Sequence, residues 1–117
     1  YKTSGSFGFD NRAVQEGKKL QLPLYALAAQ QGLKIGDVQE GFYFHVQTAE
    51  PSSFKMSSYW GDGKKGPEAA MESAVKNGWK AVSSIRDGQY KPKTPDGGCP
   101  LYCPAVDFCW HFRAQRW

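Results

Sequence analysis

The sequence has few cysteines and no long apolar run. It contains no run of about eighteen apolar residues, the length that a membrane-spanning helix needs, so no membrane span is expected. No basic and then apolar leader follows Tyr1, so we expect no signal peptide. Internal repeats and long low-complexity tracts are also absent from the sequence. Its 117 residues suit one small domain and are too few for two independent cores.

The charge balance is mildly basic. Fifteen Lys and Arg against eleven Asp and Glu give a formal net charge of +4. Such an excess is compatible with a phosphate-bearing partner, although many domains that bind no nucleic acid share it. Hydrophobic residues make up 40% and aromatic residues 15%, a balance that is typical of globular chains and excludes a disordered or collagen-like one.

A first helix is predicted to begin at about Lys18 or Lys19 and to run to residue 31. Pro23 suits its first turn, because the N–H that proline lacks has no intrahelical partner there. Gly32 stands where a left-handed C-cap is usual. The apolar residues that recur at helical spacing are Leu20, Leu24, Leu27 and Ala28.

A half-buried strand is predicted over residues 38–47, because apolar and polar residues alternate there. One face carries Phe42, Phe44 and Val46, and the other carries Tyr43, His45 and Gln47. His45 is given no functional role, since a satisfied or exposed histidine is the simpler interpretation. Residues 49–66, rich in Ser, Gly and Lys, predict a loop with a short strand around residues 54–59.

A second helix is predicted from Pro67 to just before Gly88. A connector with two prolines and the cysteine segment follow it. Together with a strand end at residues 1–3, these elements predict part of an α/β layer with too few strands for a free-standing sheet. We expect a single partial domain, with a core over residues 1–88 and a connector and tail over residues 89–117. The apolar stripe of the second helix is Met71, Val75, Trp79, Val82 and Ile85.

Two polar side chains share one face of the first predicted helix. Gln21 and Tyr25 stand four residues apart, so both can reach the same site. Spacing alone favours a simpler arrangement, in which Gln21 is exposed and Tyr25 buries its ring with its hydroxyl in water. Lys2, taken singly, is most simply a solvated charge.

Taken together, these residues resemble the PD-(D/E)XK nucleases of the RecB and AddB type. In that family an acidic residue, any residue and a lysine end a core strand, and the following helix carries Gln-x-x-x-Tyr. The chain reads YKTSG at residues 1–5 and QLPLY at residues 21–25. Residues 41–44 look like the next strand of the family, and residues 87–92 look like the turn before its cysteine tail.

The resemblance implies a partial restriction-endonuclease-like core and a metal-dependent nuclease that cleaves DNA in repair or recombination with a helicase partner. Lys2 would hold the attacking water or screen the scissile phosphate, and the carbonyl of Tyr1 would complete the shell of Mg²⁺ or Mn²⁺. Gln21 and Tyr25 would position the substrate. The acidic ligands of the family would precede Tyr1, and Mg²⁺ is normally bound through one or two carboxylates. We therefore expect the chain alone to be inactive.

Three cysteines, Cys99, Cys103 and Cys109, lie within eleven residues. They form a poor disulfide framework and a plausible metal-ligand cluster, which favours a reducing, cytoplasmic setting. The resemblance implies a [4Fe–4S] cluster completed by a fourth cysteine outside the chain, although the first gap is three residues where the family more often has two. Zinc with His111 as fourth ligand and buried free thiols are the alternatives.

Two functions compete with the enzyme. One is a non-catalytic module that binds DNA or docks to a helicase, and the other is a zinc-stabilised interaction module. The rings and cations of residues 110–117 suit stacking on single-stranded bases and, equally, a packed terminal helix. Exposed edges of an incomplete sheet would also favour pairing with a second copy of the chain.

Overall fold

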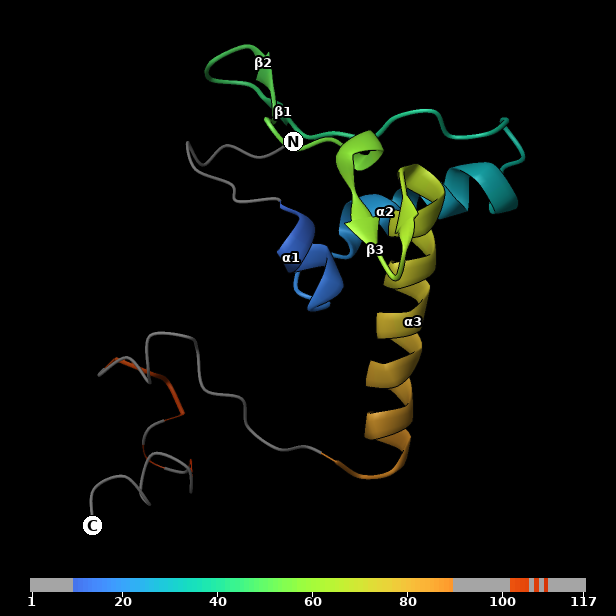
Figure 1. Cartoon of the computed structure of the whole chain (residues 1–117). Helices are drawn as coiled ribbons and strands as arrows, with labels where there is room; N and C mark the ends of the chain where they lie inside the picture. The colour runs from blue at the N-terminus through green and yellow to red at the C-terminus, as the bar shows by residue number, and fades with distance from the viewer. Residues whose placement is uncertain (1–9, 90–101, 106, 108, 110–117) are drawn as a thin grey trace. The chain divides into compact units, whose positions relative to one another are not determined.

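Residues 10–89, 102–105, 107 and 109 are described by a computed structural model (Figure 1). The chain divides into two compact units, Tyr1–Ser83 and Ser84–Trp117. The predicted strand end at residues 1–3 lies outside the described residues. Within the described part, no helix combines the length and the apolar character that crossing a membrane requires. Helices and small antiparallel sheets make up the first unit, so the predicted mixed α/β class is confirmed.

Helix α1, Asn11–Gln15, was not predicted from the sequence. Asp10 is its N-cap, and the Asp10 side chain accepts a hydrogen bond of 2.7 Å from the backbone N–H of Ala13. Val14 is fully buried and anchors the helix on the core. A helix of five residues is too short to produce a periodic apolar pattern, which explains why the sequence analysis missed it.

Helix α2, Gln21–Leu27, begins later than the predicted start at Lys18 or Lys19. The preceding turn differs from a helix because the N–H groups of both lysines donate to the carbonyl of Ala13, which closes the chain around the end of α1. Pro23 lies in the first turn of α2, as predicted, and is buried.

The end of this helix differs from the prediction. The helix continues as a π-helical turn, η1, over Ala28–Gly32. The residue with a left-handed backbone is Lys34, whose φ is 51°, and Gly32 is not among the residues with positive φ. The prediction of a left-handed cap at Gly32 is therefore wrong, because the wider turn carries helical backbone through this glycine.

Most of the strand predicted over residues 38–47 does not form ladder hydrogen bonds. Only β1, Phe44–His45, does so, and it pairs antiparallel with β2, Glu50–Pro51. Residues 38–43 are held by isolated bonds instead, since the N–H of Val38 donates to Gln30 Oε1 at 3.0 Å and the Gly41 carbonyl accepts from the N–H of Met56 at 2.8 Å. The predicted length of the strand is therefore wrong.

The predicted alternation is present, but the apolar face points away from the core. The side chains of Phe42, Phe44 and Val46 are 42%, 50% and 50% exposed. Tyr43, on the other face, packs against the core. A period of two residues shows that two faces differ, and the neighbouring elements decide which face is buried.

A second hairpin follows, formed by β3, Trp60–Gly61, and β4, Lys64–Lys65. Asp62 and Gly63 join the strands with φ angles of 51° and 76°, as a type I′ turn requires. The short strand predicted around residues 54–59 is wrong. A 3-10 turn, η2, occupies Met56–Ser58, because the N–H groups of Ser58 and Tyr59 bond back to residues 55 and 56.

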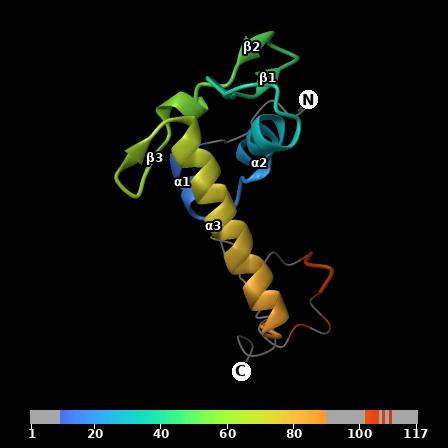
Figure 2. The same cartoon turned by 90° about the vertical axis from the view of Figure 1, so that its right-hand side faces the viewer.

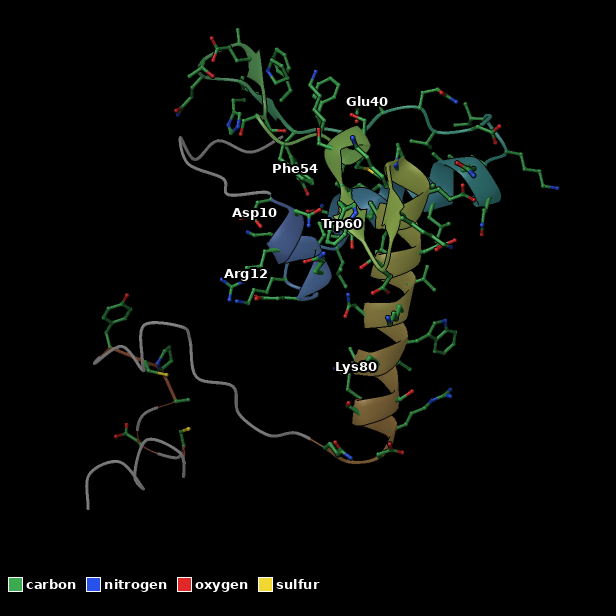
Figure 3. The ribbon with its side chains drawn as sticks, in the orientation of Figure 1. Asp10, Arg12, Glu40, Phe54, Trp60 and Lys80 are labelled. Atoms are coloured by element: carbon green, nitrogen blue, oxygen red, sulfur yellow. The ribbon has the colours of Figure 1, made fainter. Side chains whose placement is uncertain are left out.

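Side-chain amides of helix α1 form hydrogen bonds with this hairpin. Gln15 Nε2 donates to the carbonyl of Trp60 at 2.8 Å, and Asn11 also bonds to the Trp60 backbone. Figure 3 shows Trp60 next to α1, which is marked there by Asp10 and Arg12. These bonds satisfy backbone groups of β3 that no neighbouring strand pairs.

Helix α3, Pro67–Arg86, confirms the second predicted helix, and Gly88 after it has a φ of 68°. Its buried residues lie in the first half of the helix, whereas Trp79, Val82 and Ile85 are exposed. Figure 2 shows that the second half of α3 extends beyond α1 and α2. Only the first half of the predicted apolar stripe therefore contributes to the core.

The core of the first unit is small. Its buried residues are Val14, Ala26, Met56, Tyr59, Ala69, Ala70 and Met71. Partly buried side chains surround them, namely Leu22, Leu27, Val38, Tyr43 and Phe54. Because α1, α2, α3 and the segment before β3 all contribute, the core fixes the orientation of α2.

Candidate functional site

The side chains of Gln21 and Tyr25 meet on the surface of α2. Gln21 Nε2 donates a hydrogen bond of 2.9 Å to Tyr25 Oη. Both residues are exposed, and Tyr25 is 64% exposed, so its ring is not buried as spacing alone suggested. The structure thus brings these two predicted site residues together, while their role stays a prediction.

This pair leaves several polar atoms available to a ligand. The phenolic oxygen of Tyr25 accepts the bond from Gln21 and still has its own O–H to donate. Gln21 retains its second N–H and its Oε1. Such a mixed set of donors and acceptors suits the phosphate, sugar and base edges of a nucleic acid.

Tyr43 lies next to this pair. Burial raises the pKa of the Tyr43 hydroxyl, and the nearby Leu22 backbone acts in the opposite direction. The proximity of Tyr25 also acts to raise the pKa of Tyr43. The sequence analysis gave Tyr43 no role, because strand alternation does not reveal which helix a face will meet.

An ion-pair cluster precedes α2. Hydrogen bonds from Lys18 and Arg12 lower the pKa of Glu16 to about 2. The distance from Lys18 Nζ to Glu16 Oε2 is 2.8 Å. Glu16 is therefore ionised at neutral pH and connects the end of α1 to the turn that leads into α2.

The other predicted site residues are described only in part. Tyr1, Lys2 and Cys99 lie outside the described residues. Cys103 and Cys109 are partly buried free thiols. Within the described ranges, no three His, Cys, Asp or Glu side chains are placed to hold a metal ion.

These side chains do not fit a complete metal centre. A [4Fe–4S] cluster normally takes four thiolates, and the whole chain has three cysteines. Three of the described carboxylates are engaged with other residues: Glu40 with Ser57, Asp62 with Lys76 and Glu72 with Lys64.

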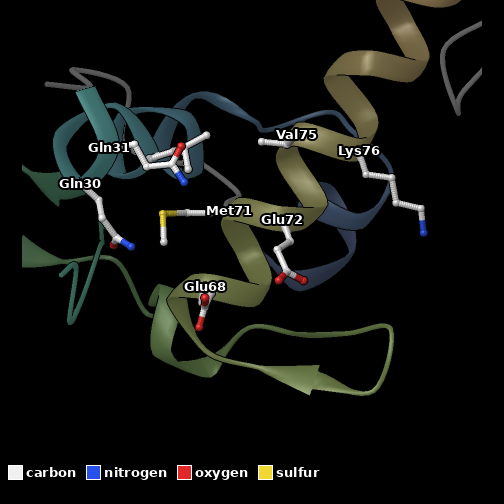
Figure 4. Close-up of a pocket in the computed structure, with 8 residues that line it drawn as sticks. Gln30, Gln31, Glu68, Met71, Glu72, Val75 and Lys76 are labelled. Carbon is white, nitrogen blue, oxygen red and sulfur yellow. The ribbon is translucent and has the colours of Figure 1, made fainter. Parts of the chain in front are cut away.

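A cavity of about 450 Å³ lies between the end of α2, η1 and the first half of α3 (Figure 4). Leu27, Met71 and Val75 give it an apolar part. Polar side chains line the rest, namely Gln30, Gln31, Glu68, Glu72 and Lys76. No motif in the sequence pointed to this cavity, since packing between distant segments creates it.

The cavity is a poor candidate for a nucleic-acid site. Glu68 and Glu72 place two carboxylates beside it, and these repel phosphate. It is lined by the C-terminal end of α2 and by η1, whereas Gln21 and Tyr25 lie in the first two turns of α2. The Gln21–Tyr25 face is therefore the better candidate for a site that contacts substrate.

The sequence model of the PD-(D/E)XK nuclease superfamily matches residues 1–110. The chain therefore belongs to the PD-(D/E)XK nuclease superfamily, whose members are phosphodiester hydrolases that generally use divalent metal ions. No curated protein and no solved structure gives a significant match. The mixed α/β structure is consistent with part of the nuclease core of this superfamily.

Proposed function

We propose that the chain is part of the nuclease domain of a RecB- or AddB-type enzyme that cleaves DNA during repair or recombination, with a helicase subunit or domain as partner. The superfamily match and the motifs at residues 1–5 and 21–25 support this proposal. The observation that carries it is the hydrogen-bonded, exposed pair of Gln21 and Tyr25.

In this function Gln21 and Tyr25 contact the substrate. Their mutual hydrogen bond restricts both side chains, which lowers the conformational entropy lost on binding. The free O–H of Tyr25 donates to a phosphate oxygen, and the free amide atoms of Gln21 orient the sugar or base. The roles of Lys2 at the scissile phosphate and of the Tyr1 carbonyl at the divalent ion rest on the family resemblance.

We also propose that the 117-residue chain does not cleave DNA by itself. Nucleases of this superfamily generally use a divalent ion, and Mg²⁺ is normally bound through one or two carboxylates. Among residues 10–89, the carboxylates of Glu16, Glu40, Asp62 and Glu72 are paired with other side chains. A non-catalytic DNA-binding role is the second candidate, because the Gln21–Tyr25 pair can bind DNA without a metal ion.

For the tail we propose a [4Fe–4S] cluster held by Cys99, Cys103 and Cys109 together with a fourth cysteine of the intact enzyme. The free thiols of Cys103 and Cys109 leave both sulfur atoms available. Iron and zinc analysis of the anaerobically purified intact enzyme tests this. Iron without zinc is the expected result, and the absence of iron would contradict it.

The test of the main proposal is binding of fluorescein-labelled single-stranded DNA, measured by anisotropy, followed by a cleavage assay with Mg²⁺ and Mn²⁺. Gln21→Ala and Tyr25→Ala are each expected to weaken binding about threefold to tenfold, the equivalent of one lost hydrogen bond. Gln31→Ala is the matched control, because Gln31 is an exposed glutamine beside the cavity. Unchanged binding in both site variants would refute the substrate role, and cleavage by the chain alone would refute its inactivity.

A further inference from the structure

The β3–β4 hairpin has an inner face toward the core and an outer face toward solvent. Tyr59, just before β3, is 1% exposed, whereas Trp60 is 60% exposed. The ring of Tyr59 lies along the inner face, because a Cβ added at Gly61 would lie 2.5 Å from Tyr59 Oη. Neighbouring residues of a strand point to opposite faces. The side chain of Trp60 therefore belongs to the outer face.

The backbone of Trp60 is held in place by α1. Its N–H donates to Asn11 Oδ1 at 2.7 Å, and its carbonyl accepts from Asn11 Nδ2 and from Gln15 Nε2, each at 2.8 Å (Figure 3). A single exposed aromatic side chain is ordinary on a protein surface. A ring on a fixed backbone, however, loses less conformational entropy when it binds a ligand. Trp60 is therefore well prepared for contact with a partner.

Lys65 lies beside this ring. It is the partner of Trp60 in the register of the hairpin, and Lys64 is the partner of Gly61. Residues directly opposite each other on antiparallel strands have their side chains on the same face, with Cβ atoms about 5 Å apart. Trp60 and Lys65, which are both exposed, therefore place an indole ring and an ammonium group together on the outer face.

Lys64, on the inner face, is engaged by carboxylates. Lys64 Nζ lies 2.6 Å from Glu72 Oε2. This hydrogen bond is the main cause that raises the pKa of Lys64, and the charges of Glu68 and Asp62 add to it. Asp62 Oδ2 also lies 2.8 Å from Lys76 Nζ. Two of the three carboxylates are thus paired with cations, and all three act on the inner face of the hairpin.

Lys65 is left to contact a ligand from outside the chain. Within the residues that the structure describes, no ion pair involves its ammonium group. An exposed ring next to a cation matches the two features of single-stranded nucleic acid, namely a base with a π-face and a charged phosphate. Docking of a protein normally buries a much larger apolar area, and Trp60 is the only exposed large apolar side chain among residues 60–65. Nucleic acid is therefore the better match.

We propose that Trp60 and Lys65 form a stacking site for single-stranded nucleic acid, in which the indole of Trp60 stacks on one base and the ammonium group of Lys65 contacts a neighbouring phosphate. The proposal rests on the proposed function for the class of ligand, but the site shares no residue with the Gln21–Tyr25 pair. Stacking tolerates any sequence, because every base has a π-face. The site therefore holds a strand without selecting its sequence.

Anisotropy with two labelled chains of equal length tests stacking in the wild type. One chain is oligothymidylate, and the other carries the same phosphates with abasic sugars in place of the nucleosides. The wild type is expected to bind oligothymidylate about fivefold or more tightly than the abasic chain, the effect of one stacked base. Equal affinity for the two chains overturns the proposal, and this comparison needs no variant.

Trp60→Ala removes the ring and keeps the backbone groups that bond to α1. It is expected to weaken binding of oligothymidylate about fivefold or more and to leave binding of the abasic chain unchanged. Trp60→Phe keeps a smaller ring and is expected to lose less. Trp79→Ala is the matched control, because Trp79 is 62% exposed and lies on α3 instead of the hairpin. An equal loss in Trp79→Ala, or an equal loss for both chains in Trp60→Ala, overturns the proposal.

Salt dependence tests the phosphate contact. Lys65→Ala is expected to reduce the slope of log affinity against log salt concentration by about one, as the loss of one phosphate contact does. Lys65→Arg is expected to restore the slope. Lys80→Ala is the control, because Lys80 is an exposed lysine on α3. An unchanged slope in Lys65→Ala, or an equal reduction in Lys80→Ala, overturns the role of Lys65.

The remaining outcomes separate this proposal from the proposed function. If Gln21→Ala and Tyr25→Ala weaken binding and Trp60→Ala does not, the stacking site is wrong and the proposed function stands. If Trp60→Ala removes the preference for bases while neither variant of the pair weakens binding, the stacking site stands and the substrate role of the pair is wrong. Absence of binding to both chains overturns both proposals.

Discussion

The side chain of Asn11 pairs with both backbone groups of Trp60, forty-nine residues further along the chain. Asn11 Nδ2 donates to the Trp60 carbonyl at 2.8 Å, and the Trp60 N–H donates to Asn11 Oδ1 at 2.7 Å. The amide thus presents the same donor and acceptor that a neighbouring strand would present. Through this contact the short helix α1 covers the free edge of β3.

Replacing Asn11 should loosen α1 and the hairpin together. We expect Asn11→Ala to lower the free energy of unfolding by about 0.5–1.5 kcal/mol, because it leaves the Trp60 N–H without its partner, while Gln15 still donates to the Trp60 carbonyl. Urea denaturation measures this. Gln31→Ala is the control, since Gln31 also carries an exposed side-chain amide. Equal stability of Asn11→Ala and the wild type would contradict the structural role of Asn11.

The low pKa of Glu16 predicts a defined pH dependence. The pKa falls from its ordinary value of 4.5 to about 2 in the folded chain, chiefly through the hydrogen bond from Lys18 and then through that from Arg12. A lowered pKa stabilises the fold above the unfolded value, so this contribution is present above pH 4.5 and is lost as the pH falls toward about 2.

A carboxyl NMR titration of Glu16 measures this pKa directly. Lys18→Ala is expected to raise the pKa of Glu16 more than Arg12→Ala does, because the bond from Lys18 makes the larger contribution. The double variant is expected to return the pKa close to its ordinary value. A pKa of Glu16 that stays near 2 in the double variant would show that the two cations are not the cause.

Alanine substitutions at two glycines are expected to change the stability of the chain in opposite directions. A Cβ added at Gly41 would lie 2.5 Å from Met56 Sδ and 3.2 Å from Met56 Cγ, and Met56 is fully buried. We expect Gly41→Ala to destabilise the chain by about 1–3 kcal/mol through overpacking. Gly78 lies within α3 and has no atom within 4 Å of an added Cβ. Gly78→Ala is expected to stabilise the chain by up to about 1 kcal/mol.

Thermal unfolding of both variants tests this pair. The Gly41→Ala/Met56→Ala double variant separates steric conflict from other causes, because removal of the Met56 side chain removes the conflict. The cost of Gly41→Ala should then be smaller in the Met56→Ala background than in the wild type. An unchanged cost would mean that Met56 is not the group that excludes a side chain at Gly41.

Local features of the chain were predictable from its sequence. Helix α3 follows from a long periodic pattern that starts at Pro67 and ends before Gly88. The meeting of Gln21 and Tyr25 follows from their spacing of four residues, because that spacing is a property of any helix. The Asp62-Gly63 turn was also present as a hairpin signal, but the strands around it are only two residues long.

Features that depend on contacts between distant segments were not predictable. Tyr43 packs against the same core as Leu22 and Leu27 of α2, and nothing in its own neighbourhood in the sequence specifies those partners. The capping of β3 by Asn11 is of the same kind. The position of Lys2 relative to Gln21 and Tyr25 stays a prediction, because Lys2 lies outside the described residues.

The exposure of the apolar face around β1 can be tested directly by mutation. If the apolar face of residues 42–46 were buried, Phe44→Ala would cost about 3–5 kcal/mol. Because Phe44 is 50% exposed in the structure, we expect a loss of less than about 1.5 kcal/mol. Phe54→Ala is the matched control, since Phe54 packs against the core, and it is expected to cost about 2 kcal/mol or more. Chemical denaturation of the two variants ranks them, and a larger loss for Phe44→Ala than for Phe54→Ala would mean that the apolar face is covered in the folded chain.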